Sequence, residues 1–336
     1  MKNNLESILF EKHWHLACHK NELRNNNDYL RFNTQFGDVT IFNDYGELIA
    51  FDNLCAHRGA SIFLKNYGNS EFKCPYHNWI YKKGKIFIPK KTSYILKEEP
   101  QINRYELSYC GDFIFFSVKP KASLKKQLGD AFEVISEISK IISIRKDFNR
   151  YIYQCFWPIA IENALEPIHI KSIHPDTLGK LEFDDGEDIF YNKCSLYKTK
   201  IKSKTTNKKL LKLKKYFSSD FYDGYFSIYI FPFAMISTTF GYSFSIQNYY
   251  PGNNEESTFF TSRFYSAKLI DDNYKEMLES FFTSSFQLNH KIFNEDNSIC
   301  KKIPKNSWNT KSLRYYSVME EKINHFRSLC QSENIS

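Results

Sequence analysis

The sequence predicts an α+β protein with an N-terminal antiparallel β module followed by a layered arrangement of sheet and helix. Short runs rich in β-branched and aromatic residues fill residues 29–118, separated by turn signals such as Phe36-Gly37-Asp38. Further strand-like segments follow, and then a long helical pattern runs from Asp271 to about Lys302. With 336 residues, 42% hydrophobic and 25% charged, the chain is long enough for two globular domains.

The first half reads as a series of strands. Alternation and turn residues place them at 29–36, 39–44, 47–54, 71–81, 85–88 and 112–118. From Lys119 to about Asn149 the apolar residues instead take a helical period, and Pro120 marks the change. We therefore predict a first domain at 1–120 and a second at 121–336.

The second half predicts a sheet covered by a C-terminal helix. A strand is expected at 151–161, a helix over the next motif, and strands at 226–231, 235–250 and 257–269. Alternation along a strand buries one face, so most aromatic residues here are expected to be core. Those expected around a pocket on this sheet are Phe231, Phe233, Met235, Phe240, Phe244 and Tyr249.

Composition and charge argue against several classes of protein. The net charge of +8 is mild, and the basic run Lys198–Lys215 contains Leu and Thr where a nucleic-acid surface would carry aromatic residues. That run is expected to be a solvated face, with a docking surface for an acidic partner as the alternative. We find no apolar stretch of the roughly 18 residues that a membrane span requires. The N-terminus lacks a signal core, and eight unevenly spaced cysteines do not suggest disulfides, so we expect a soluble, cytoplasmic protein.

Two cysteine–histidine pairs stand in the first half in the pattern C-x-H-x16-C-x2-H. Cys55 and His57 form one pair, and Cys74 and His77 form the other. A Rieske [2Fe-2S] cluster takes two thiolates on one iron and two imidazoles on the other. The alternative, a Cys2His2 zinc site, usually groups two cysteines in one pair and two histidines in the other. The mixed pairs favour the Rieske cluster.

Two histidines in the second half complete the pattern N-x2-E-x2-H-x4-H, formed by Asn163, Glu166, His169 and His174. Two imidazoles and one carboxylate on one face of Fe(II) leave coordination positions open for dioxygen. Histidines five residues apart lie about half a turn out of phase on a regular helix, so a shared metal requires an irregular one. Pro167 favours such an irregularity. Taken alone, the pair is also compatible with ordinary structure.

These motifs, in this order, resemble those of Rieske-type ring-hydroxylating oxygenase α subunits. The segments LIAFDNLCAHRGASI and FKCPYHNWIY are similar to that family's Rieske domain, and the two-histidine motif is similar to its catalytic motif. Asn78 is a departure, because the family usually has glycine after the second cluster histidine. Asparagine tolerates the left-handed backbone better than other non-glycine residues, so we expect the turn to be kept.

The resemblance implies two cofactors, a [2Fe-2S] cluster and a mononuclear Fe(II). Glu295-Asp296 is similar to the family's late acidic element, in which the aspartate coordinates iron, although the glutamine that usually follows is missing. We predict that Asp296 is the iron ligand, with Glu295 as the alternative. If no metal is bound, the two residues are an acidic pair on a solvated helix face. The implied ligands are Cys55, His57, Cys74 and His77 for the cluster and His169, His174 and Asp296 for the iron.

Glu166 stands where many family members have an aspartate that bridges a cluster histidine of one subunit to an iron histidine of its neighbour. A carboxylate there can accept a hydrogen bond from both imidazoles and orient them. Choline and carnitine oxygenases resemble this sequence in having glutamate at that position. The resemblance also implies a homotrimer and a helix-grip (START-like) catalytic domain.

The function implied is that of an oxygenase component that hydroxylates or oxidatively demethylates a small organic substrate with O2. Electrons would come from an NAD(P)H-dependent reductase, directly or through a ferredoxin, because the sequence has no glycine-rich dinucleotide fingerprint of its own. Two alternatives remain at this point: a Rieske electron-transfer protein with a non-catalytic C-terminal domain, and a zinc-stabilised binding module. No nucleic acid or membrane partner is expected.

Overall fold

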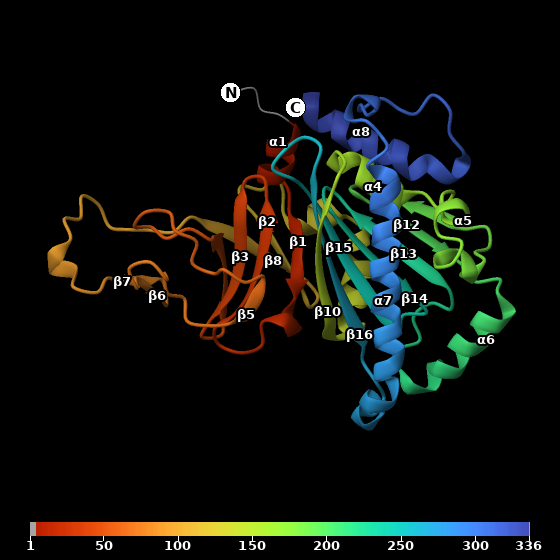
Figure 1. Cartoon of the computed structure of the whole chain (residues 1–336), viewed down its shortest axis with the longest axis horizontal. Helices are drawn as coiled ribbons and strands as arrows, with labels where there is room; N and C mark the ends of the chain where they lie inside the picture. Colours follow the sequence, from red (N-terminus) through yellow and green to blue (C-terminus); the bar gives the residue numbers. More distant parts are fainter. Residues whose placement is uncertain (1–4, 336) are drawn as a thin grey trace.

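The structure, a computed structural model, describes residues 5–335 and contains two seven-stranded antiparallel sheets. Most of the helices pack on the second sheet (Figure 1). The predicted α+β class is confirmed. In the described part of the N-terminal segment, α1 (Leu5–Lys12) is a helix, and Met1–Asn4 lie outside the described residues.

The first sheet has the strand order β1-β9-β8-β4-β3-β2-β5. Its strands are β1 (His15–His19), β2 (Asp28–Thr34), β3 (Gly37–Asp44), β4 (Glu47–Asp52), β5 (Tyr67–Asn69), β8 (Arg104–Cys110) and β9 (Phe113–Ser117). The sequence predicted β2, β3, β4 and β9 but missed β1, β5 and β8. β5 has only three residues, none of them buried, whereas β8 does alternate in sequence but buries only Cys110.

The segment predicted as a strand at 71–81 is wrong over most of its length. Only Ile80–Lys82 is extended, as β6, and it pairs with β7 (Lys85–Phe87) in a separate hairpin. The preceding residues form a tight loop instead. This hairpin lies at the end of the molecule farthest from the second sheet (Figure 1).

The connection between the sheets is helical for a shorter stretch than predicted. Helices α2 (Leu124–Leu128) and α3 (Ala131–Ile141) carry the apolar period, and the chain then turns directly into β10 (Ile142–Tyr153). The predicted helix therefore ends about eight residues early. The predicted domain boundary at 120/121 lies between β9 and α2, and it stays a prediction.

The second sheet has the order β10-β16-β15-β14-β13-β12-β11. Its remaining strands are β11 (Glu187–Phe190), β12 (Cys194–Thr199), β13 (Tyr225–Ile230), β14 (Ala234–Thr239), β15 (Ser243–Pro251) and β16 (Thr258–Ala267). The predicted strands at 226–231, 235–250 and 257–269 are confirmed, with a turn dividing the middle one into β14 and β15. β11 and β12 were not predicted.

After β10, the described part of the chain also contains five α-helices, and the long α7 lies over the second sheet (Figure 1). They are α4 (Trp157–Leu165), α5 (Ile170–Ile173), α6 (Lys204–Leu213), α7 (Lys275–Cys300) and α8 (Glu321–Ile335). The strand predicted at 151–161 is wrong beyond Tyr153, because Trp157-Pro158 opens α4, where proline costs no hydrogen bond. Short 3-10 helices are η1 (Lys20–Glu22), η2 (Lys91–Ser93), η3 (Leu178–Leu181), η4 (Lys214–Tyr216), η5 (Asp272–Tyr274), η6 (Lys305–Ser307) and η7 (Val318–Glu320).

The basic run predicted as a solvated face forms α6 and η4, and four of its lysines on α6 are exposed: Lys204, Lys208, Lys209 and Lys212. Among residues 5–335, no helix combines the length and the hydropathy needed to cross a bilayer.

Candidate metal centres

The first cysteine–histidine pair lies on a tight loop after β4. The Cys55 amide donates to the Ala60 carbonyl at 2.9 Å, and the Gly59 amide donates to the Cys55 carbonyl at 2.8 Å. Gly59 has a φ of +71°, a conformation that glycine adopts without a steric penalty. These bonds close the loop so that Cys55 is buried while His57 is half-buried at the surface.

The second pair repeats this backbone pattern. The Cys74 amide donates to the Trp79 carbonyl at 2.8 Å, and the Asn78 amide donates to the Cys74 carbonyl at 3.0 Å. Asn78 has a φ of +61°, so the prediction that asparagine preserves the glycine-like turn is confirmed. Two loops of the same shape therefore present one cysteine and one histidine each.

The two histidines of these loops approach each other, and so do the two cysteines. The Nδ1 atoms of His57 and His77 lie 3.1 Å apart, and their ring centroids are 4.7 Å apart. Cys55 and Cys74 are buried, and burial raises the pKa of the Cys55 thiol, with the Cys74 thiol adding to the effect. Two buried sulfurs and two convergent imidazole nitrogens are the donor set of a Rieske [2Fe-2S] cluster, so the residues present fit that group.

Two side chains that sequence reasoning missed support this centre. Tyr81 donates its hydroxyl hydrogen to Cys55 Sγ at 3.2 Å and accepts the Ala56 amide at 3.0 Å. The Trp79 ring stacks on His57 with centroids 4.8 Å apart and planes 12° from parallel. Both belong to the segment FKCPYHNWIY, but nothing in their spacing distinguishes them from ordinary core residues.

The second centre is built on a broken helix. α4 ends at Leu165, the chain passes through Pro167, and a single helical turn, α5, separates His169 from His174. His169 precedes this turn and His174 follows it with φ −117°, outside the helical region. The irregularity that the five-residue spacing required is confirmed, and it lets both imidazoles face the same point.

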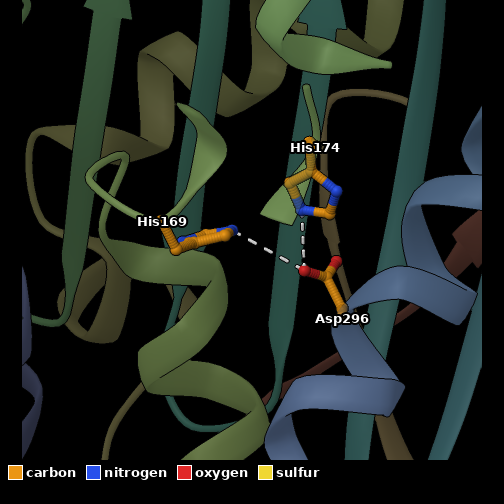
Figure 2. A group of neighbouring side chains, drawn as sticks. All are labelled: His169, His174 and Asp296. Carbon is orange, nitrogen blue, oxygen red and sulfur yellow. Dashed lines mark hydrogen bonds and ion pairs between the residues drawn. The ribbon is translucent and has the colours of Figure 1, made fainter. Parts of the chain in front are cut away.

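Asp296 of α7 completes this group (Figure 2). Its Oδ1 lies 2.9 Å from His174 Nε2 and 3.6 Å from His169 Nε2. One ligand atom from each of the three side chains lies within 4.8 Å of the others. Asn163 donates to the same Oδ1 at 2.8 Å and fixes its position. Two imidazoles and one carboxylate converging on one side form the donor set of a mononuclear Fe(II) site, so these residues fit that metal.

The other nitrogen of each histidine meets a different carboxylate. Glu166 Oε1 lies 2.7 Å from His169 Nδ1, and Glu295 Oε2 lies 2.7 Å from His174 Nδ1. The Thr177 hydroxyl donates to Glu295 Oε2 at 2.8 Å. Such partners fix which ring nitrogen is free to bind a metal. Glu295, the alternative ligand, thus lies on the far side of His174 from Asp296.

Burial lowers the pKa of His174, but hydrogen bonds and charges from Asp296 and Glu295 outweigh burial and raise the pKa above its ordinary value. A dication at this point would take the place of the proton between His174 and Asp296.

A cavity of about 240 Å³ adjoins the three convergent side chains. Its wall is formed by alternate residues of the second sheet, including Ser227, Met235, Ser245, Gln247 and Tyr249. Successive residues of a strand face opposite sides of the sheet. Only every second residue of each strand can therefore line the cavity.

Met235 and Tyr249 line the cavity as expected. Phe231, Phe233, Phe240 and Phe244 do not, which corrects that expectation. Phe244 faces the opposite side of β15, and the other three lie in turns between strands, where they pack into the core. The cavity wall formed by the sheet instead contains many hydroxyl groups.

The two centres lie at opposite ends of the molecule (Figure 1). The loops of the first centre lie beside the β6–β7 hairpin, whereas α5 and α7 carry the second over the far sheet. Electron transfer between the two centres within one chain would have to run along the long axis of the molecule.

Comparison with known proteins gives two family matches. Residues 13–93 match the model of the Rieske [2Fe-2S] domain, and residues 142–331 match that of the ring hydroxylating alpha subunit (catalytic domain). The second match alone covers more than half of the chain.

Curated relatives include both dioxygenases and monooxygenases. The anthranilate 1,2-dioxygenase large subunit of Acinetobacter baylyi is 31% identical over 182 residues, covering 50% of this chain and 38% of that protein. The chloroplastic choline monooxygenase of Beta vulgaris is 21% identical over 349 residues, covering 96% and 72%. The chain covers about two fifths of the length of the anthranilate, toluate and 2-halobenzoate dioxygenase subunits that it matches.

Solved structures share the fold. The quaternary ammonium Rieske monooxygenase CntA in complex with L-carnitine superposes with a TM-score of 0.74 at 16% identity, covering 98% of this chain and 91% of that chain. Naphthalene 1,2-dioxygenase from Rhodococcus sp. gives a TM-score of 0.71 at 15% identity, with the same coverage. The predicted arrangement of a Rieske domain before a sheet with a long helix is confirmed.

Proposed function

Because the chain belongs to the family of ring-hydroxylating α subunits, we propose that it is the oxygenase component of a Rieske non-haem iron system. It uses O2 to hydroxylate or oxidatively demethylate a small organic substrate. The observation that carries this proposal is the presence, in one chain, of both donor sets, one in each matched region. An electron-transfer protein, the alternative, would require neither the second donor set (His169, His174 and Asp296) nor the cavity beside it.

For the cluster, the proposed ligands are Cys55, His57, Cys74 and His77. For the iron they are His169, His174 and Asp296. Asp296 is favoured over Glu295 because its Oδ1 faces the Nε2 atoms of both histidines. Glu295 instead contacts Nδ1 of His174, the position of a carboxylate that orients a metal-bound imidazole.

When bound, the cluster would supply single electrons and the iron would supply open coordination positions for oxygen chemistry. The protein's part is orientation and exclusion of water. Asn163 holds the Asp296 carboxylate, Thr177 holds Glu295, and Glu166 holds the His169 ring through Nδ1. The hydroxyl-rich strands close the cavity on the side opposite α7.

Glu166 is proposed as the bridge to a neighbouring subunit. Its Oε1 contacts His169, and its side chain is 14% exposed, so it lies near the surface where a second imidazole could reach it. The separation of the two centres supports a head-to-tail ring, and a homotrimer is the proposed assembly. Electrons are proposed to come from an NAD(P)H-dependent reductase, directly or through a ferredoxin, and the location is proposed to be cytoplasmic.

Metal content and spectroscopy of anaerobically purified protein test the proposal. We expect about three irons and two acid-labile sulfides per chain, because a [2Fe-2S] cluster and one Fe(II) are both bound. The reduced protein should give an electron-spin-resonance signal with average g well below two. Oxygen uptake coupled to product formation, driven by a surrogate reductase, checks the activity. Absence of acid-labile sulfide after reconstitution would refute the proposal, and two irons per chain without turnover would favour the electron-transfer alternative.

The ligand assignment has its own test. Asp296→Asn should lose the mononuclear iron and keep the cluster spectrum, whereas Glu295→Gln should weaken Fe(II) affinity by roughly 10–100-fold, as expected for an orienting partner. Glu276→Gln, in the exposed first turn of α7, is the control and should change neither. Iron loss in Glu295→Gln with iron retained in Asp296→Asn would reverse the two roles.

A further inference from the structure

A buried lysine lies in the wall of the cavity that adjoins the second centre. Lys322 of α8 is 3% exposed and lines the cavity together with His169, His174 and Asp296. Its Nζ lies 3.4 Å from Asp188 Oδ1 and 4.4 Å from the centroid of the Tyr197 ring. Lysine is rarely buried without a partner for each of its hydrogens, so a lysine in a substrate cavity calls for an explanation.

The charges of this pair are incompletely stabilised by the protein. Burial lowers the pKa of Lys322 to about 8, although Asp188 and Glu166 act in the opposite direction. Burial also raises the pKa of Asp188, against the effect of Lys322. An ammonium group has three donors, and one carboxylate at 3.4 Å does not saturate them. A further acceptor at Nζ would therefore be bound favourably.

The sheet side of the cavity carries a group of polar side chains among apolar ones. Gln247 Nε2 donates to Ser237 Oγ at 3.2 Å and to Ser245 Oγ at 3.3 Å, and Gln247 Oε1 accepts the Tyr249 hydroxyl at 2.6 Å. All four of these side chains line the cavity. Ser237 Oγ accepts a hydrogen bond in this network, and its own hydroxyl hydrogen can be donated to a polar ligand.

The helix beside the cavity adds positive charge. Thr206 and Leu210 of α6 line the cavity, while Lys208, Lys209 and Lys212 of the same helix are exposed to solvent. A basic surface next to a cavity raises the local concentration of anions and their rate of entry.

We propose that the substrate carries a carboxylate, and that Lys322 binds this group at the end of the cavity formed by α8 and β12. The remainder of the substrate then lies along the hydroxyl-rich strands toward His169, His174 and Asp296. Lys322 is thus a specificity-determining residue of the same site. This inference rests on the proposed function, because it takes the cavity to be the substrate pocket.

Equilibrium binding to the anaerobic holoenzyme tests the proposal without turnover. The probes are two acid–amide pairs, benzoate with benzamide and hexanoate with hexanamide, measured by ligand-observed NMR and calorimetry. We expect at least one acid to bind tenfold or more tightly than its amide, and Lys322→Met to remove that preference. Lys322→Arg, which keeps the charge, should retain most of it. If neither acid binds better than its amide, or if Lys322→Met leaves the preference unchanged, the proposal is wrong.

Lys198→Met is the matched control, because Lys198 stands on β12 and pairs with Glu187 of β11 but does not line the cavity. It should bind both acids as the parent protein does. Cluster absorbance and thermal denaturation show whether each variant is folded.

The unmodified protein offers a second measurement should Lys322→Met fail to fold. The charged and aromatic groups that face Lys322 are Asp188 of β11, Glu166 after α4 and the Tyr197 ring of β12. Acid binding should weaken as the pH rises through and beyond about 8, while amide binding stays constant. Acid binding that is flat from pH 7 to 10 would contradict the assignment.

The outcomes separate this inference from the function on which it rests. If protein without sulfide or iron still binds an acid through Lys322, the proposed oxygenase function is refuted and the proposed anion site is supported. Protein with full metal content and coupled turnover, but no effect of Lys322→Met on acid binding, would overturn only the anion site.

Discussion

Single residues decide the shape of the two cluster loops. Gly59 and Asn78 occupy equivalent positions, both with positive φ and both donating their amide to the carbonyl of the loop cysteine. In the first loop glycine adopts this conformation freely, and in the second asparagine does so at a small cost.

Substitution of Asn78 tests this equivalence. Asn78→Gly should leave the free energy of unfolding within about 0.5 kcal/mol and keep the cluster, because glycine tolerates the same φ. Asn78→Val should cost about 1–3 kcal/mol and reduce cluster content, because a β-branched residue is strained at a φ of +61°. Urea unfolding and sulfide analysis measure both effects. Equal behaviour of the two variants would show that the positive φ is not required.

At this scale the sequence predicted which polar side chains the fold brings together and left one choice open. The mixed Cys/His pairs and the turn at Asn78 could be predicted because ligand type and turn preference are local properties. The choice between Glu295 and Asp296 could not, because adjacent residues on a helix point about 100° apart and only the packing of α7 decides which one faces the histidines.

The elements that hold the second centre are short and irregular. α5 is a single turn, and the chain after His174 folds back so that the Gly179 amide donates to the His174 carbonyl at 2.8 Å. A Cβ at Gly179 would lie 2.8 Å from that same carbonyl oxygen, which is backbone and cannot move aside cheaply. The return of the chain therefore fixes the position of His174.

Gly179→Ala should displace His174 and weaken Fe(II) binding tenfold or more, while leaving the cluster spectrum unchanged, because the first centre lies at the other end of the molecule. Iron titration of the apo site checks this result. Lys180→Ala is the control, since Lys180 is exposed in the same 3-10 helix. Unchanged iron affinity in Gly179→Ala would mean that the turn can relax without moving the ligand.

Element prediction succeeded where the hydrophobic period was strong and failed where tertiary contacts decide. The strands β13–β16 and helix α7 have clear patterns, whereas β11 has only four residues and β12 ends in the basic run. Trp157–Ile161 reads as a strand by composition, yet it forms α4 because it packs between the sheet and the C-terminal helices. Nothing in the sequence near Lys322 predicts its place, because tertiary packing alone brings α8 to the cavity.

At the scale of the molecule, a buried ionic cluster joins the two sheets. Glu22 of η1, next to the first sheet, lies 2.5 Å from Arg145 of β10 and 3.5 Å from Arg263 of β16 in the second. Tyr265 also donates to its carboxylate. Burial would raise the pKa of Glu22, but the charges of Arg263 and Arg145 outweigh burial and lower the pKa below its ordinary value of 4.5.

Glu22→Gln should destabilise the protein at pH 7 by about 3–5 kcal/mol, because it leaves the buried guanidinium of Arg263 without its counter-charge. A carboxyl with a lowered folded pKa contributes stability above its unfolded pKa and loses it as the pH falls. The difference in unfolding free energy between the parent and this variant should therefore shrink below about pH 4.5. Denaturant unfolding at pH 7, 5 and 3.5 measures it. Glu137→Gln, which removes an exposed ion pair with Lys140, is the control. If the difference in unfolding free energy between parent and Glu22→Gln stayed constant down to pH 3.5, the role of Glu22 would be contradicted.

The two centres lie toward opposite ends of the long axis of the molecule, and this arrangement bears on assembly (Figure 1). A ring in which each cluster serves the neighbouring iron predicts complementation between two inactive variants. His77→Ala should disable the cluster and Asp296→Asn the iron, so each alone should be inactive.

Trimers that contain both variants should recover about a third of the parent activity, because one of the three interfaces in every mixed trimer pairs an intact cluster with an intact iron. Differently tagged chains, purified in tandem, provide the mixed assembly, and coupled oxygen uptake provides the readout. A mixture of the two separately assembled proteins is the control and should stay inactive, because no interface joins the two variants. Verified mixed rings without activity would mean that electrons pass within one chain, and the bridging role of Glu166 would then have no basis.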